Sequence, residues 1–213
     1  MKEELNYQYS KSEEKLNVLT HAFGLLLSIV GLPFLIIKSL NYDGFWKPVS
    51  ILIYGVSLIV LYTASTFYHA SKDTTMRRRL NIFDHAAIYV LIAGTYTPYT
   101  VIILEGTLGW FIFGLTWTFT LIGIILKLFY TGKFDKLSTL MYVLMGWQIV
   151  LVIKPIIAKL STEGLQLLIA GGVFYTIGAL LYSIKKIQYN HAIFHVFVVL
   201  GSLFHFFSIY FFI

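Results

Sequence analysis

Long apolar runs alternate with short polar segments along the whole chain. Seven runs are about long enough to cross a bilayer, because a helix needs roughly 20 apolar residues to span about 30 Å of hydrocarbon. They cover residues 18–37, 49–68, 86–104, 108–126, 137–153, 165–184 and 192–213. The runs are continuously apolar and lack the alternation of a barrel wall. The pattern therefore predicts an all-α membrane protein with a seven-transmembrane helix bundle.

The polar stretch before the first run lacks the short basic and apolar layout of a removable signal peptide. We expect residues 1–17 to form a cytoplasmic N-terminal arm and residues 18–213 to form a single seven-transmembrane domain. Pro98 falls inside the third run, where its missing N–H and its ring disturb a helix. A kink is expected there.

Composition supports a membrane location and limits the chemistry. Hydrophobic residues make up 58% of the 213 positions and charged residues only 12%, more apolar surface than one soluble core of this length can bury. The absence of cysteine excludes disulfides, thiolate metal sites and cysteine nucleophiles. Any bound metal must therefore be held by nitrogen and oxygen.

The net charge of +6 indicates orientation in the membrane and not a nucleic-acid partner, because the basic residues are dispersed between apolar runs. With the N-terminus in the cytoplasm, twelve of the sixteen Lys and Arg residues lie on that side: Lys2, Lys11, Lys15, Lys72, Arg77, Arg78, Arg79, Lys127, Lys133, Lys136, Lys185 and Lys186. The positive-inside rule predicts a cytoplasmic N-terminus and a C-terminus outside.

Histidines gather at one level of this predicted bundle. His69 ends the second run, while His191 and His195 begin the seventh run on the same side. Residues four apart share a helix face, so His191 and His195 can converge on one point, and Ser65 lies one turn deeper on the face of His69. Three imidazoles with an open fourth position commonly bind catalytic zinc. Nitrogen ligands favour Zn²⁺, although iron and copper are also compatible with them.

The HxxxH spacing lacks the glutamate of the HExxH metalloprotease helix, so the group that orients water must come from elsewhere. Asp84, at the start of the third run, is the one carboxylate that the predicted topology places to do so. His205 lies about 15 Å deeper by helical rise, so we expect it to pack or hydrogen-bond within the bundle. His85 suits a supporting or interfacial role, and the role of His21 stays open.

Five stretches together resemble the hemolysin III family, the bacterial branch of the progestin and adipoQ receptors. They are "EEKLNVLTHAFG", "STFYH", "FDHAAIYVLIAGTYTPY", "YVLMGW" and "HAIFHVFVVLGSLFH", at residues 13–24, 65–69, 83–99, 142–147 and 191–205. The resemblance implies a multi-pass protein of the bacterial plasma membrane with Zn²⁺ bound near the cytoplasmic face.

The resemblance also implies roles for single residues. His69, His191 and His195 match the zinc ligands, Asp84 matches the residue that holds the zinc-bound water, and Ser65 matches the nearby serine. Phe194 stands where many relatives have tryptophan, a difference that affects packing beside the site.

Three functions are compatible with such a site, with membrane lipids as substrate or ligand. The leading hypothesis is zinc-dependent hydrolysis of a lipid amide or ester, supported by an analogy of site layout with alkaline ceramidases. Asp84 would position water and carry its proton, and Ser65 would bond the developing oxyanion. In the second hypothesis zinc links spans two, three and seven of a lipid sensor without catalysis. The third, a pore-forming cytolysin, is disfavoured because we find no water-soluble amphipathic segment.

Overall fold

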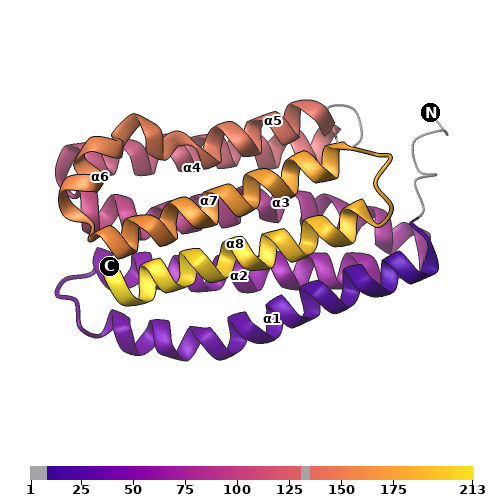
Figure 1. Cartoon of the computed structure of the whole chain (residues 1–213), viewed down its shortest axis with the longest axis horizontal. Helices are drawn as coiled ribbons and strands as arrows, with labels where there is room; N and C mark the ends of the chain where they lie inside the picture. The colour runs from indigo at the N-terminus through magenta and orange to yellow at the C-terminus, as the bar shows by residue number, and fades with distance from the viewer. Residues whose placement is uncertain (1–8, 131–134) are drawn as a thin grey trace.

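The computed structural model describes residues 9–130 and 135–213, which form a bundle of long helices lying side by side (Figure 1). The helices are α1 (Lys11–Ser39), α2 (Trp46–Ala70), α3 (Thr74–Pro98), η2 (Tyr99–Leu104), α4 (Gly106–Tyr130), α5 (Asp135–Gly146), η3 (Gln148–Val152), α6 (Ile153–Lys159), α7 (Thr162–Ser183) and α8 (Asn190–Phe212). In this part of the chain they form seven spans long and apolar enough to cross a membrane, and no strand is present. The predicted all-α, seven-span fold is confirmed.

Helix α1 begins earlier than the first apolar run. The hydroxyl of Ser10 accepts a hydrogen bond from the backbone N–H of Glu13 at 3.2 Å, an N-cap that satisfies one of the free donors of the first turn. Residues 11–17, the second half of the predicted arm, are therefore turns of α1. Residues 1–8 of that arm lie outside the described residues.

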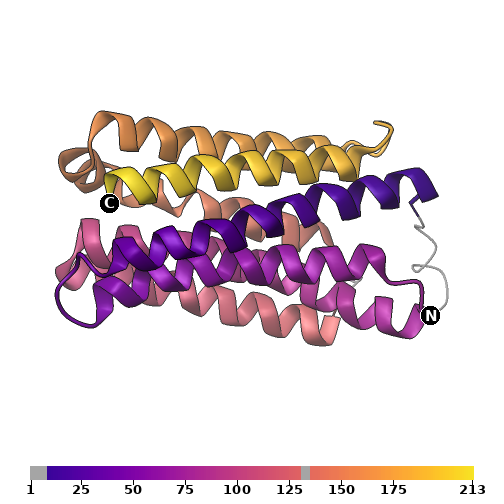
Figure 2. The ribbon, with the colours of Figure 1, turned by 90° about the horizontal axis from the view of Figure 1, so that it is seen from below.

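The chain runs back and forth, so segments far apart in sequence share one end of the bundle. Helix α1 packs against both α2 and α8, and α7 packs along α8 (Figure 2). The start of α1, the end of α2 and the start of α8 all lie at the right-hand end of Figure 1. Helix α8 ends at the opposite end. Which end faces the cytoplasm stays a prediction from the charge distribution.

The third span changes helix type at the proline. Regular α-helix ends at Pro98 and continues as the π-helix η2, so the expected disturbance takes the form of a wider helical turn. The span then closes in a tight turn, where Glu105 and Gly106 adopt φ values of 53° and 56°. Glu105 also forms an ion pair with Lys47 at 2.6 Å, which joins this turn to the first turn of α2.

The fifth span is broken after Gly146. Helix α5 gives way to the 3-10 helix η3 and then α6, so the span extends to Lys159, beyond the predicted run. Tyr96 of α3 compensates for the break: its hydroxyl donates to the carbonyl of Gly146 at 2.8 Å and accepts from the N–H of Ile149 at 2.7 Å. Backbone that leaves the helix at membrane depth is tolerated when protein groups satisfy it in this way.

The interior contains many buried polar side chains beside an apolar core, while large apolar side chains cover much of the outside. Tyr62 and Tyr175 each hydrogen-bond the hydroxyl of Ser202 at 2.7 Å, and Tyr99 donates to Ser208 at 2.7 Å. Exposed leucine, isoleucine, valine and phenylalanine occur on most of the helices. This distribution suits a protein whose solvent is lipid, because hydrogen bonds between helices hold the interior together there.

Candidate metal centre

Three histidines from two helices meet at one end of the bundle. His69 occupies the last turn of α2, and His191 and His195 project from the first turns of α8. The side chain of Asn190 fixes the start of α8 by donating to the carbonyl of Tyr182 at 2.9 Å. One ligand atom from each histidine lies within 4.8 Å of the other two, and all three side chains are buried. The structure thus brings together the three residues predicted as ligands.

The spacing between two of these rings fits a tetrahedral metal. The Nε2 atoms of His69 and His191 lie 3.1 Å apart. Two nitrogen ligands at about 2.0–2.1 Å from a tetrahedral zinc ion stand roughly 3.3 Å apart, so only a slight separation of these rings is needed. The ring centroid of His195 lies 5.0 Å from that of His69 and 4.4 Å from that of His191.

The opposite ring nitrogens have partners from the beginning of α1. Nδ1 of His69 lies 2.7 Å from a carboxylate oxygen of Glu14. Nδ1 of His195 lies 3.2 Å from the backbone carbonyl oxygen of Asn17. Both oxygens are acceptors, so these two Nδ1 atoms carry the ring hydrogen and their Nε2 atoms keep a lone pair.

Tyr9 provides the partner for Nδ1 of the third histidine, His191. Its hydroxyl lies 3.0 Å from Nδ1 of His191, and its ring packs 4.7 Å from the ring of His191. Burial raises the pKa of Tyr9, and the neighbouring Tyr182 and Tyr68 raise it further, so the phenol keeps its proton. The phenol oxygen can accept the Nδ1 hydrogen, which leaves Nε2 of His191 free to bind a metal.

Imidazoles that bind a metal normally donate their other N–H to a carboxylate, a carbonyl or another oxygen. All three histidines have such an oxygen beside Nδ1. The residues therefore fit a cation that prefers nitrogen ligands, as zinc does, while iron or copper would accept the same donors.

Asp84 and Ser65 lie beside this group but do not join it. Asp84 of α3 is buried, yet within the described parts of the chain the group of close ligand atoms contains only the three histidines. Ser65 of α2 is also buried, and among the described residues its hydroxyl has no hydrogen-bond partner. Both line the cavity that also borders His191 and His195.

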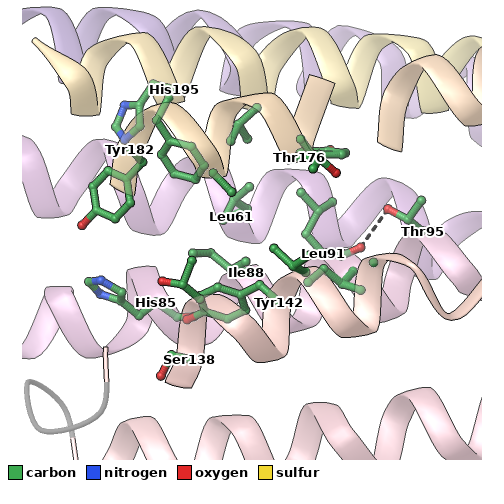
Figure 3. A pocket seen from close by; sticks show the side chains of 18 of the residues that line it. Leu61, His85, Ile88, Leu91, Thr95, Ser138, Tyr142, Thr176, Tyr182 and His195 are labelled. Carbon is green, nitrogen blue, oxygen red and sulfur yellow. Dashed lines mark hydrogen bonds between the residues drawn. The ribbon is translucent and has the colours of Figure 1, made fainter. Parts of the chain in front are cut away.

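That cavity has a volume of about 170 Å³ and extends from the histidines into the bundle. Figure 3 shows His195 and Tyr182 on one side of it and His85 and Tyr142 on the other. Toward the right of the view, Thr95 and Thr176 continue the lining. Most of the wall is apolar, so the cavity suits a molecule with a hydrocarbon chain and a polar group that faces the histidines.

The other histidines have separate positions. His205 donates from Nε2 to the carbonyl of Leu168 at 3.1 Å, which confirms the expectation of a hydrogen bond within the bundle. Nδ1 of His85 lies 2.7 Å from the carbonyl of Asn81. His21 stacks on His195 with ring centroids 3.5 Å apart, and neither of its ring nitrogens has a partner among the described residues.

Comparison with known proteins decides the family. The family model described as "Haemolysin-III related" matches residues 9–206. The chain belongs to this family. Among curated relatives it is 45% identical to the Hemolysin-3 homolog of Bacillus subtilis, over 95% of each chain. It is 43% identical to Hemolysin-3 of Bacillus cereus, over 94% of this chain and 92% of that protein.

A more distant relative is the human Monocyte to macrophage differentiation factor. It is 30% identical to this chain, over 95% of the chain and 85% of that protein. No solved structure matches the chain significantly. The resemblance inferred from the sequence motifs is thus confirmed, and a haemolysin-III membrane protein with seven apolar helices is a multi-pass protein.

The sequence interpretation of this haemolysin-III chain missed part of the site. It took Asp84 as the one carboxylate near the histidines, but Glu14 lies closer, within hydrogen-bond distance of His69. Glu14, Asn17 and His21 follow one another at spacings of three and four, so they share a face of α1. That periodicity, at the start of an apolar run, was the sequence signal that could have indicated a polar helix face near the site. Tyr9 lies before the helix and had none.

Proposed function

We propose that the chain binds Zn²⁺ through His69, His191 and His195 and hydrolyses a lipid amide or ester. One observation carries the proposal: three buried imidazoles gather beside a cavity into which a serine and an aspartate also face. When bound, zinc supplies a Lewis acid that polarises a carbonyl group and makes water more acidic.

The residues of the chain have distinct parts in this reaction. The three imidazoles hold the metal at the polar end of the cavity. Asp84 accepts a proton from the attacking water and returns it to the leaving group, a task for a carboxylate that lines the reaction space. The Ser65 hydroxyl, which has no partner among the described residues, donates to the oxyanion that develops on the substrate.

The substrate class follows from the cavity wall. Its lining is mostly apolar and includes His191, His195 and Asp84, so a lipid with one cleavable carbonyl fits better than a water-soluble compound. Two classes of lipid meet this requirement: amides such as ceramides, and acyl esters. The substrate would enter sideways from the leaflet that faces the histidine end of the bundle.

A lipid sensor is the second candidate, and one feature of the site favours it. The ligands come from α2 and α8, while partners of their Nδ1 atoms come from α1. A metal ion at this point would link three spans, and a ligand in the adjoining cavity could change how they pack. In that case the fourth position of the metal would be closed to water.

The name hemolysin, carried by the two bacterial relatives, denotes lysis, so a cytolysin is the third candidate. All seven long helices among the described residues are already apolar enough to span a membrane. Such a protein differs from a water-soluble toxin that refolds to form a pore.

The test uses purified protein in liposomes that contain ceramides, acyl amides or phospholipids, with release of fatty acid as the readout. Zinc-bound wild-type protein should release fatty acid from one lipid class, and chelation should stop the release. Bound zinc without turnover on any class would favour the sensor. Leakage of an encapsulated dye without hydrolysis would favour the cytolysin.

A further inference from the structure

Glu14 connects a metal-ligand candidate to an arginine. One carboxylate oxygen lies 2.7 Å from Nδ1 of His69, and the other forms an ion pair with Arg77 of α3. The side chain of Glu14 is 19% exposed, whereas that of His69 is fully buried. A single carboxylate thus links α1, α2 and α3 beside the candidate metal centre.

Arg77 is itself fixed to the end of α2. Its guanidinium donates to the carbonyl oxygens of Tyr68 and Ser71, at 3.4 Å and 3.2 Å, and lies 4.7 Å from the centre of the Tyr68 ring. These carbonyls lie at the C-terminus of α2, where the following turn no longer supplies the regular helical donors. Arg77 therefore holds both Glu14 and the backbone on either side of His69.

The adjacent arginines do not share this arrangement. Arg78 and Arg79 are exposed, and neither has an ion pair within the described residues. Counting charges treats all three arginines as equivalent markers of the cytoplasmic side. The structure separates Arg77 from them, because its side chain contacts Glu14 and the end of α2.

We propose that Glu14, held by Arg77, is a positioning residue that presents His69 to the metal. The carboxylate accepts the Nδ1 hydrogen, fixes the tautomer in which Nε2 carries the lone pair, and makes that nitrogen a stronger donor. The inference rests on the metal site proposed above. It adds a residue that contacts neither the metal nor the substrate.

The experiment measures metal affinity directly. Wild-type protein and the variants Glu14→Ala, Glu14→Gln, Glu14→Asp and Arg77→Gln are purified in detergent and titrated with zinc against a competing chelator. Glu13→Gln and Arg78→Gln serve as controls, because they remove the same charges one position away. Thermal unfolding of the metal-free proteins shows whether each variant is folded.

We expect Glu14→Ala to weaken zinc binding about 10- to 100-fold, the range seen when the oxygen partner of a metal-binding histidine is lost. Glu14→Asp should recover part of the affinity, because it restores the charge. Glu14→Gln and Arg77→Gln should cause smaller losses, and both controls should match wild type. The cobalt-loaded Glu14→Ala protein should also show shifted visible absorption bands, which a purely structural role would not produce.

The results separate the two proposals. Wild-type affinity and an unchanged cobalt spectrum in Glu14→Ala would overturn the positioning role while leaving the metal site intact. Wild-type protein that binds no more zinc than His191→Ala would overturn the metal site and this inference with it. Should Glu14→Ala fail to fold, Glu14→Gln and Arg77→Gln decide, and wild-type affinity in both would refute the positioning role.

Discussion

The Nε2 atoms of His69 and His191 lie 3.1 Å apart, although 122 positions separate the two residues in the chain. Two ring nitrogens this close need a hydrogen or a cation between them, because their lone pairs otherwise repel. The Nδ1 partners Glu14 and Tyr9 allow both rings to turn Nε2 toward the shared space. The spacing of the two rings fits the metal ion proposed above.

Loss of either imidazole should remove the metal. We expect His69→Ala and His191→Ala to retain only a small fraction of the zinc of wild-type protein, since two nitrogen ligands do not complete the site. His205→Ala is the matched control, because His205 is equally buried in α8 but bonds the carbonyl of Leu168. Metal analysis of the purified proteins provides the measurement. Equal zinc in all four proteins would defeat the ligand assignment.

The substitution Asp84→Asn should reduce lipid hydrolysis without reducing zinc binding. The amide cannot take a proton from water, so we expect lipid hydrolysis to fall about 10²- to 10⁴-fold while zinc content stays at the wild-type level. Fatty-acid release and metal analysis on the same sample provide the comparison. Unchanged turnover in Asp84→Asn would contradict the role given to this carboxylate.

Ser65→Ala should lower turnover about 10²- to 10³-fold, the usual effect of losing one donor to an oxyanion. Ser28→Ala serves as the control: Ser28 is also a buried serine, but its hydroxyl donates to the carbonyl of Gly24 in its own helix. The same hydrolysis assay applies to both variants. A loss of similar size in Ser28→Ala would point to general disturbance of the bundle and against a role for Ser65.

The predicted orientation can be tested with single cysteines, because the natural chain has none. Thr75, at the histidine end, and Asp43, at the other end, are both exposed. With the N-terminus in the cytoplasm, a maleimide that cannot cross the membrane should label Asp43→Cys in intact cells. Thr75→Cys should react only after the cells are opened, and the reverse pattern would invert the predicted topology.

Two glycines of α4 should respond in opposite ways to alanine. A Cβ atom on Gly109 would lie 2.2 Å from the carbonyl oxygen of Thr100, whereas one on Gly114 would meet nothing within 4 Å. We expect Gly109→Ala to destabilise the bundle by about 1–3 kcal/mol, since backbone must move to make room. Gly114→Ala should not lower stability. Thermal unfolding in detergent compares them, and equal effects would argue against this packing of α4 on η2.

The ion pair between Lys47 and Glu105 predicts a dependence on pH. A hydrogen bond and positive charge from Lys47 lower the pKa of Glu105 in the folded protein. The ion pair therefore contributes fully to the stability of the folded protein above the unfolded pKa of Glu105, about 4.3. This contribution is lost as the pH falls through the pKa that Glu105 has in the folded protein. Wild type should melt slightly higher than Glu105→Gln at pH 7, and this difference should shrink as the pH falls below the unfolded pKa of Glu105. A difference that persists in acid would contradict this origin.

Apolar patterning predicted the seven spans because it depends only on local sequence, and the spacing of His191 and His195 placed both rings on one face of α8. The approach of Glu14 and Tyr9 could not be predicted in the same way. It depends on how α1 packs against α2 and α8, which no local pattern specifies. The role of Arg77 could not be predicted for the same reason. Its ion pair with Glu14 joins α3 to α1, whereas the positive-inside rule only counts basic residues on each side of the membrane.

Tyr96 has a consequence for how the protein is made. The bend in the fifth span depends on a phenol in the third, which takes the place of the missing helical partners of Gly146 and Ile149. During synthesis the third span leaves the ribosome first, so this hydroxyl is already present when the fifth arrives. Without the Tyr96 hydroxyl, the fifth span would enter the membrane with the carbonyl of Gly146 and the N–H of Ile149 lacking this partner. A single continuous helix would then be the more stable form of that span.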